Sequence, residues 1–125
     1  MIKQIKSSEI KTFLTDNKNV ELLDVRTQEE WDSVGRPDGK DLGLKTHFIT
    51  IVRSSDPAAN KEFIEEVKKA IDPNKELLVM CKAGGRSMMA SQLLYQENIK
   101  CINVSDGFEG NGEDHGWKNE GLPSE

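Results

Sequence analysis

The sequence predicts an α/β fold, a three-layer sandwich in which helices cover both faces of a mostly parallel, five-stranded sheet. Three stretches, residues 20–25, 77–80 and 99–104, are almost continuously apolar, which is typical of parallel strands buried on both faces. Segments with apolar residues at helical spacing lie between them. Strands that alternate with helices favour right-handed crossovers and hence a parallel sheet.

Two weaker patterns bring the predicted sheet to five strands. Residues 5–7 form a short first strand, and residues 47–52 form a strand whose alternation is less regular. A long polar stretch, residues 35–46, leads into the second of these patterns. It leaves the register of that strand open.

The first two helices are predicted from an apolar face and from a capping signal. Ile10, Phe13 and Leu14 share one face of a helix after the first strand. Thr27 and Glu30 have the spacing of a capping box, in which a hydroxyl and a carboxylate each satisfy a first-turn amide. A short helix is therefore expected just after residue 27.

The last two helices have clearer boundaries. Asp56 and Pro57 suit the N-cap and first position of a helix that Asp72 and Pro73 end. Its apolar stripe consists of Phe63, Ile64, Val67, Ala70 and Ile71. A final helix begins beyond residues 84–85, with the Met88 and Met89 pair in its core. Its apolar face consists of Met89, Ala90, Leu93 and Leu94.

The chain is expected to form a single domain over residues 1–125, since 125 residues with 35% apolar content suffice for one core and not for two. Residues 107–125 are polar and rich in glycine. We expect an ordered tail over the surface, anchored by Phe108, Trp117 and Leu122.

Composition excludes several classes of partner and location. Acidic residues outnumber basic ones by 22 to 17, and no basic stripe is present, so nucleic acid is not an expected partner. Every apolar run is far shorter than the roughly 20 residues that cross a bilayer, so no membrane contact is expected. Residues 1–6 are basic but lack the apolar stretch of a secretory signal, which favours the cytoplasm.

The most informative stretch is a strand that ends at Cys81 and continues through a tight loop into a helix. Two consecutive glycines in the loop tolerate positive φ, so that backbone N–H groups can converge on one point. The helix that follows adds its own unpaired N–H groups and its positive dipole end. We expect this anion cradle to stabilise the thiolate of Cys81, the candidate catalytic nucleophile. The cradle itself is formed by Lys82, Ala83, Gly84, Gly85, Arg86 and Ser87.

Other reactive side chains have simpler structural interpretations. Cys101 lies within a predicted buried strand, where packing alone explains it, although a resolving thiol is an alternative. Asp24 and Arg26 follow a central strand next to the predicted site, and such charges more often hold neighbouring loops than contact substrate. His47, His115 and the two cysteines do not have the spacing of a metal site.

The loop resembles the active-site loop of the rhodanese-like domains, which reads C-x-x-G-x-R between a strand and a helix. Residues 81–86 match this motif throughout. Residues 35–40 depart from the Gly-His-Ile-Pro-Gly-Ala stretch that many members carry. Further matches to the family are residues 23–26, Glu29, Glu30, Trp31, residues 106–108, Trp117 and residues 121–123.

The resemblance implies a sulfurtransferase that needs no metal or organic cofactor. Cys81 would take sulfane sulfur from a donor such as thiosulfate or a persulfide, and would pass it from a Cys81 persulfide to a thiol, cyanide or protein acceptor.

Two alternatives remain open. Cysteine phosphatases also place a thiolate in an anion-binding loop with an arginine, but their motif is C-x-x-x-x-x-R, and here only four residues separate Cys81 from Arg86. A binding or regulatory module that keeps the fold without turnover is the second alternative.

Overall fold

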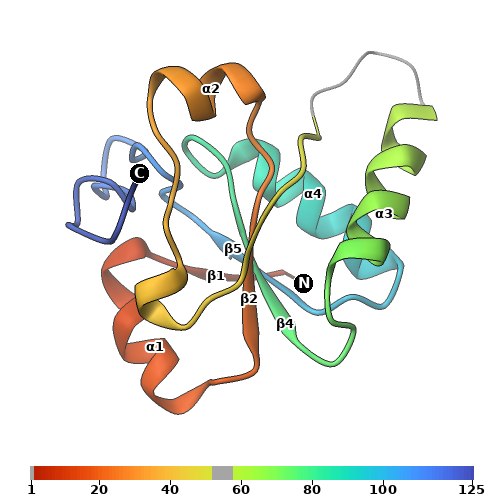
Figure 1. Cartoon of the computed structure of the whole chain (residues 1–125), viewed down its shortest axis with the longest axis horizontal. Helices are drawn as coiled ribbons and strands as arrows, with labels where there is room; N and C mark the ends of the chain where they lie inside the picture. The colour runs from red at the N-terminus through yellow and green to blue at the C-terminus, as the bar shows by residue number, and fades with distance from the viewer. Residues whose placement is uncertain (1, 52–57) are drawn as a thin grey trace.

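The computed structural model describes residues 2–51 and 58–125, and its centre is a five-stranded parallel sheet with strand order β1-β5-β4-β2-β3 (Figure 1). The strands are β1 (Lys3–Ile5), β2 (Val20–Asp24), β3 (Thr46–Phe48), β4 (Glu76–Met80) and β5 (Cys101–Val104). The predicted α/β sandwich with a five-stranded parallel sheet is therefore confirmed.

Helices connect the strands and cover both faces of the sheet, as Figure 1 shows for α1 and the C-terminal tail on one side and α3 and α4 on the other. The α-helices are α1 (Ile10–Asp16), α2 (Gln28–Ser33), α3 (Ala58–Ala70) and α4 (Gly85–Gln96). Two 3₁₀ turns are also present, η1 (Ser7–Glu9) and η2 (Lys40–Leu42). Among the described residues, no helix is long and apolar enough to cross a bilayer.

Each face of the sheet has its own hydrophobic core, because successive strand residues point to opposite faces. The core under α1 and the tail includes Ile10, Leu14, Leu22, Leu78, Met80, Ile102, Phe108 and Trp117. The core under α3 and α4 includes Leu23, Phe63, Val67, Leu77, Val79, Cys81, Ala90, Leu94 and Cys101. Complete burial of one large apolar side chain contributes about 1.5–3 kcal/mol.

The predicted boundaries of two strands were wrong. The first strand is Lys3–Ile5 rather than residues 5–7, because Ser7 turns inward and binds the carboxylate of Asp106 through both its amide and its hydroxyl. The strand predicted at residues 47–52 is Thr46–Phe48, where Leu23 pairs with His47; residue 52 lies outside the described residues. The proposed cap at Asp56 and Pro57 lies outside the described residues.

The buried face of α4 also differs from the predicted apolar stripe. Met89 is 47% exposed, so the prediction that it belongs to the core of the helix was wrong. The buried residues are Ser87, Ala90, Ser91 and Leu94. Ser91 Oγ donates a hydrogen bond to the carbonyl of Ser87, which lets a hydroxyl occupy a buried position that hydrophobic periodicity cannot predict.

The C-terminal tail is ordered, as expected, and is held by both apolar and polar anchors. Phe108, Trp117 and Leu122 are buried in the core under α1. The indole Nε1 of Trp117 donates to the carbonyl of Pro123 at 2.7 Å. The amide of Gly116 donates to Asp106, so that carboxylate ties the tail to the turn after β1.

Candidate active site at the end of strand β4

Cys81 directly follows β4, at the carboxyl end of the sheet, and it is only 1% exposed. Its sulfur faces the inside of the loop that leads into α4. The backbone amide of Gly84 donates a hydrogen bond to Sγ at 3.1 Å, and Ser87 Oγ lies 3.3 Å from Sγ. The loop therefore curls around the sulfur, in the orientation that an anion cradle requires.

The close curl of the loop depends on Gly84. Its φ of +102° is strained for residues with a side chain, and a Cβ at this position would run into the backbone carbonyl of Ser105. Gly85 is different, since it is the first residue of α4 and a Cβ there would meet open space. Of the two glycines predicted to supply positive φ, only Gly84 does so.

Gly107 packs closely against the backbone of the loop, a contact that the sequence analysis did not predict. Its φ is +60°, and a Cβ there would collide with the carbonyl groups of Cys81 and Lys82. The next two amides, those of Phe108 and Glu109, donate to those carbonyls at 2.8 and 3.0 Å. The start of the tail thus holds the backbone of Cys81 and Lys82 in place.

The residues of the loop differ in how far they are exposed to solvent. Lys82, Ala83 and Gly85 are exposed, whereas Gly84 and Ser87 are buried. The amides of the first turn of α4 have no partner within the helix, because helical bonding begins four residues later. These N–H groups and the dipole of a 12-residue helix favour a negative charge at this end.

The guanidinium of Arg86 is bound by Glu30 of α2. Its two terminal nitrogens donate to the two carboxylate oxygens at 2.7 and 2.8 Å. The hydrogen bonds to Glu30 raise the pKa of Arg86, and the nearby charge of Cys81 adds to this effect. In this structure the side chain of Arg86 joins α4 to α2.

The carboxylate of Glu30 accepts four hydrogen bonds, two from Arg86 and two from Thr27. Its bonds to Arg86, together with those from the amide and hydroxyl of Thr27 in the predicted capping box, lower the pKa of Glu30 to about 2, against an opposing effect of burial. The capping box is therefore confirmed, and it also orients the carboxylate toward α4.

Replacing Glu30 with glutamine is expected to make the free energy of unfolding depend less on pH between the ordinary pKa of 4.5 and the folded pKa of about 2. The folded pKa of about 2 lies below the ordinary value of 4.5, so the carboxylate stabilises the fold above pH 4.5 and loses this effect as the pH falls toward 2. Because the pair is partly exposed, we expect a loss of about 1 kcal/mol at neutral pH.

Urea denaturation of wild type and Glu30→Gln from pH 7 to pH 2 measures this difference. The gap between the two proteins, that is, the difference in their free energies of unfolding, should disappear as the pH approaches 2. Glu29→Gln, at an exposed neighbouring position, is the matched control and should track the wild type. A gap that stays constant over the whole range would contradict the assignment.

Asp24 and Arg26 form a completely buried ion pair beside the loop, with Arg26 Nη2 at 2.9 Å from Asp24 Oδ2. The same nitrogen donates to the carbonyl of Gly35, and the guanidinium lies 4.3 Å from the centre of the Phe108 ring. The pair thus connects β2 to the segment after α2 and to the tail.

Cys101 lies at the start of β5, at the other end of the sheet from Cys81, and both cysteines are free thiols. Burial, with a smaller contribution from the charge of Glu76, raises the pKa of Cys101 to about 12. A thiol of this kind remains protonated at neutral pH and is a poor nucleophile.

Asn103 is a buried polar residue of β5 that the sequence analysis did not single out. It is 1% exposed and lies on the same face of the sheet as Val79, its partner in register. Its side chain reaches the carbonyl of Gly84 and the hydroxyl of Ser87. A single asparagine in an apolar strand carries no periodic signal, so only the fold brings it to the site.

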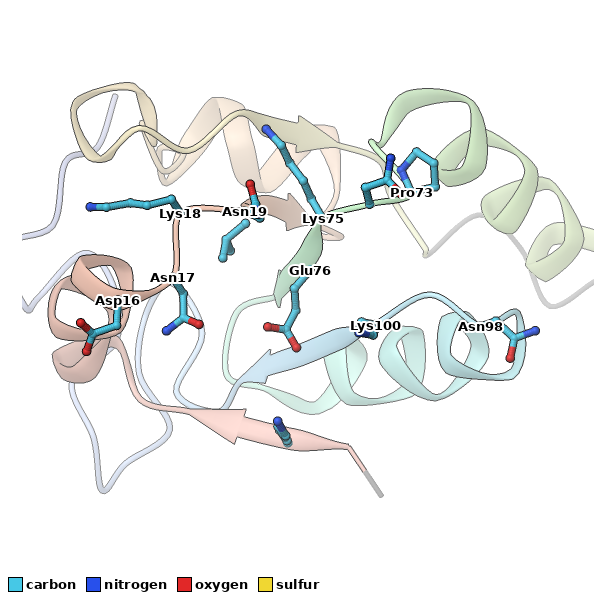
Figure 2. A pocket seen from close by; sticks show the side chains of 12 residues that line it. Asp16, Asn17, Lys18, Asn19, Pro73, Lys75, Glu76, Asn98 and Lys100 are labelled. Atoms are coloured by element: carbon cyan, nitrogen blue, oxygen red, sulfur yellow. The ribbon is translucent and has the colours of Figure 1, made fainter.

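A separate hollow of about 640 Å³ lies at the amino ends of the strands (Figure 2). Lys18, Lys75, Lys100 and Glu76 are among the residues that line it, and neither cysteine is. Lys75 is already engaged with the buried carboxylate of Glu21 at 3.8 Å. Cys81 lies at the opposite end, beyond the carboxyl end of β4, where ligands bind in parallel α/β folds.

Comparison with known proteins agrees with the fold. Residues 7–113 match the model of the rhodanese-like domain. A crystal structure of a Mycobacterium tuberculosis protein superposes with a TM-score of 0.81 at 32% identity, covering 98% of this chain and 96% of that one.

Relatives in sequence span nearly the whole chain. A Rickettsia prowazekii protein is 36% identical over 124 residues, which is 98% of this chain and 97% of that protein. Thiosulfate sulfurtransferase 18 of Arabidopsis thaliana is 30% identical over 102 residues, which is 81% of this chain and 71% of that protein. On the family match over residues 7–113 and on these relatives, the chain belongs to the rhodanese-like domain family.

Proposed function

We propose that the chain is a sulfurtransferase that carries sulfane sulfur as a persulfide on Cys81. The observation that carries this proposal is the position of Sγ, which lies inside a turn at the start of α4 and accepts a hydrogen bond from the amide of Gly84. An anionic sulfur at this point gains from hydrogen bonds and from the helix dipole. The similarity to a plant thiosulfate sulfurtransferase supports the same chemistry.

The reaction we propose is a double displacement. The Cys81 thiolate attacks the sulfane sulfur of thiosulfate, a new S–S bond forms, and sulfite leaves with the electron pair of the broken S–S bond. A persulfide donor would release its thiolate in the same way. A nucleophilic acceptor, such as cyanide, a thiol or a protein thiol, then attacks the outer sulfur and returns Cys81 to the thiolate.

The loop residues have separate roles in this proposal. The backbone amides from Ala83 to Ser87 donate hydrogen bonds to the negatively charged outer sulfur, as preorganised donors do in an oxyanion hole. The exposed Lys82 attracts anionic donors at the mouth. Arg86 contributes charge while its hydrogen bonds hold α2 against α4. The donors and acceptors in this proposal are diffusible, and the cytoplasm is the proposed location.

Two features of the site disfavour the phosphatase alternative. The loop between Cys81 and Arg86 has four residues, one fewer than the phosphatase motif. The arginine that would bind a phosphate is engaged in two short hydrogen bonds with Glu30.

A non-catalytic module would have no need for a sulfur that faces the amide of Gly84.

Thiocyanate release from thiosulfate and cyanide, compared with hydrolysis of an aryl phosphate under the same conditions, tests the proposal. We expect thiocyanate release with ping-pong kinetics and no phosphate hydrolysis above background. Hydrolysis of the aryl phosphate alone would assign the site to a phosphatase. Activity toward neither substrate would favour the binding module.

A further inference from the structure

The side chain of Asn103 is held in one orientation by its neighbours. Its Nδ2 lies 3.2 Å from the carbonyl oxygen of Gly84 and 3.2 Å from Oε1 of Gln4. Both of these atoms accept hydrogen bonds, so the nitrogen must face them. Oδ1 is therefore the atom that faces Ser87, and it can only accept.

Ser87 lies between two acceptors and has one hydroxyl proton to donate. Its Oγ is 2.5 Å from Asn103 Oδ1 and 3.3 Å from Cys81 Sγ. Two oxygens at 2.5 Å need a proton between them, and Oδ1 has none, so the Ser87 proton lies on the Asn103 side. Ser87 then turns lone pairs toward the sulfur.

This arrangement suits a thiol better than a thiolate. A neutral Cys81 can donate its S–H to the lone pairs of Ser87, whereas a thiolate would face them without a proton in between. A thiolate gains the Ser87 hydrogen bond only if the hydroxyl rotates away from Asn103. We propose that Asn103 is a positioning residue that competes with the Cys81 thiolate for the Ser87 proton and so sets the pH at which Cys81 becomes reactive.

The charged groups around the sulfur are the same in all the variants that test this competition. Those that face the loop are Lys82 in the loop, Arg86 of α4 with its partner Glu30 of α2, and Asp24 of β2 with its partner Arg26. Asp106, after β5, is turned toward Ser7 and Gly116. A shift caused by Asn103 therefore comes through Ser87 or through the carbonyl of Gly84, the two groups that Asn103 contacts in the loop and α4, and the Ser87→Ala background tells these routes apart.

The test is the pH profile of Cys81 alkylation by iodoacetamide, measured for wild type and for Asn103→Leu. Leucine keeps nearly the shape of asparagine and has no acceptor, so the Ser87 proton becomes free for the thiolate. Because the freed hydroxyl can donate a hydrogen bond to the charged sulfur, we expect the midpoint of the profile to fall by about one pH unit.

The Ser87→Ala background separates competition from a general structural effect. With Ser87 absent, Asn103→Leu should no longer move the midpoint. Gln4→Leu is the matched control, because Gln4 contacts the nitrogen end of the same amide and should leave the midpoint unchanged. An unchanged or raised midpoint in Asn103→Leu, or the same shift with and without Ser87, would overturn the proposal.

An infrared spectrum of the Cys101→Ala protein gives a second test if Asn103→Leu does not fold. The S–H band of Cys81 should lie at the frequency of a hydrogen-bonded thiol and should move to that of a free thiol when Ser87 is also replaced by alanine. A band that does not move would contradict the model.

The consequence for sulfur transfer rests on the proposed function, but the readouts do not. Alkylation and infrared spectra report the thiol itself. If the protein released no thiocyanate, the proposed function would fail while the competition for the Ser87 proton could still be measured.

Discussion

Replacing Cys81 by alanine is expected to reduce thiocyanate release to background, by at least about 1,000-fold, because no other group in the loop can form the covalent intermediate. The comparison is the rate of thiocyanate release by wild type and variant at matched protein concentration. The sulfur of Cys81 is buried against the loop, and its removal takes away the proposed nucleophile without removing an ion pair or a large apolar core residue.

Cys101→Ala is the matched control for this variant. Cys101 is also a buried thiol in the core under α3 and α4, but its pKa of about 12 keeps it protonated and it lies at the opposite end of the sheet. We expect this variant to lose about 1 kcal/mol of stability and to keep its turnover. Equal loss of activity in both variants would show that the effect is structural rather than chemical.

Gly84→Ala is expected to have the second largest effect, on both stability and activity. Alanine would have to adopt a φ near +102°, and its methyl group would overlap the backbone carbonyl of Ser105. Strain of this kind costs about 1–3 kcal/mol, and the overlap adds to it because a backbone atom cannot move aside cheaply. The amide that donates to Sγ would move with the loop, so thiocyanate release should fall sharply as well.

Gly85, the next residue, provides the matched control for Gly84→Ala. Gly85→Ala places a methyl group in open space at the first position of α4, where alanine is well tolerated. We expect a change in stability within about 0.5 kcal/mol and nearly normal turnover. Urea denaturation and thiocyanate release measured on both variants test the contrast, and similar behaviour of the two would contradict the conformation assigned to the loop.

Local patterns in the sequence predict most of this fold. The apolar runs around Leu22, Leu78 and Ile102 identify the three central strands, and the spacing from Thr27 to Glu30 identifies the start of α2. The first strand was predicted wrongly because a distant partner determines the local structure there. Ser7 turns inward because Asp106 binds it from 99 positions away.

In the candidate site, too, local patterns predict one part, and contacts between distant residues determine the rest. The position of Cys81 between a strand and a glycine turn is readable from the sequence, because strand, turn and helix signals are local. The pairing of Arg86 with Glu30 spans 56 positions and depends on how α2 packs against α4. The contact between Ser87 and Asn103 likewise exists only because β5 lies beside β4 in the sheet.

Intact mass spectrometry after brief exposure to thiosulfate, followed by peptide mapping, tests the persulfide most directly. We predict that the wild-type protein gains the mass of one sulfur atom, that the added sulfur maps to the peptide containing Cys81, and that cyanide removes it. A protein whose mass is unchanged, or one in which the added sulfur maps to Cys101, would contradict the account.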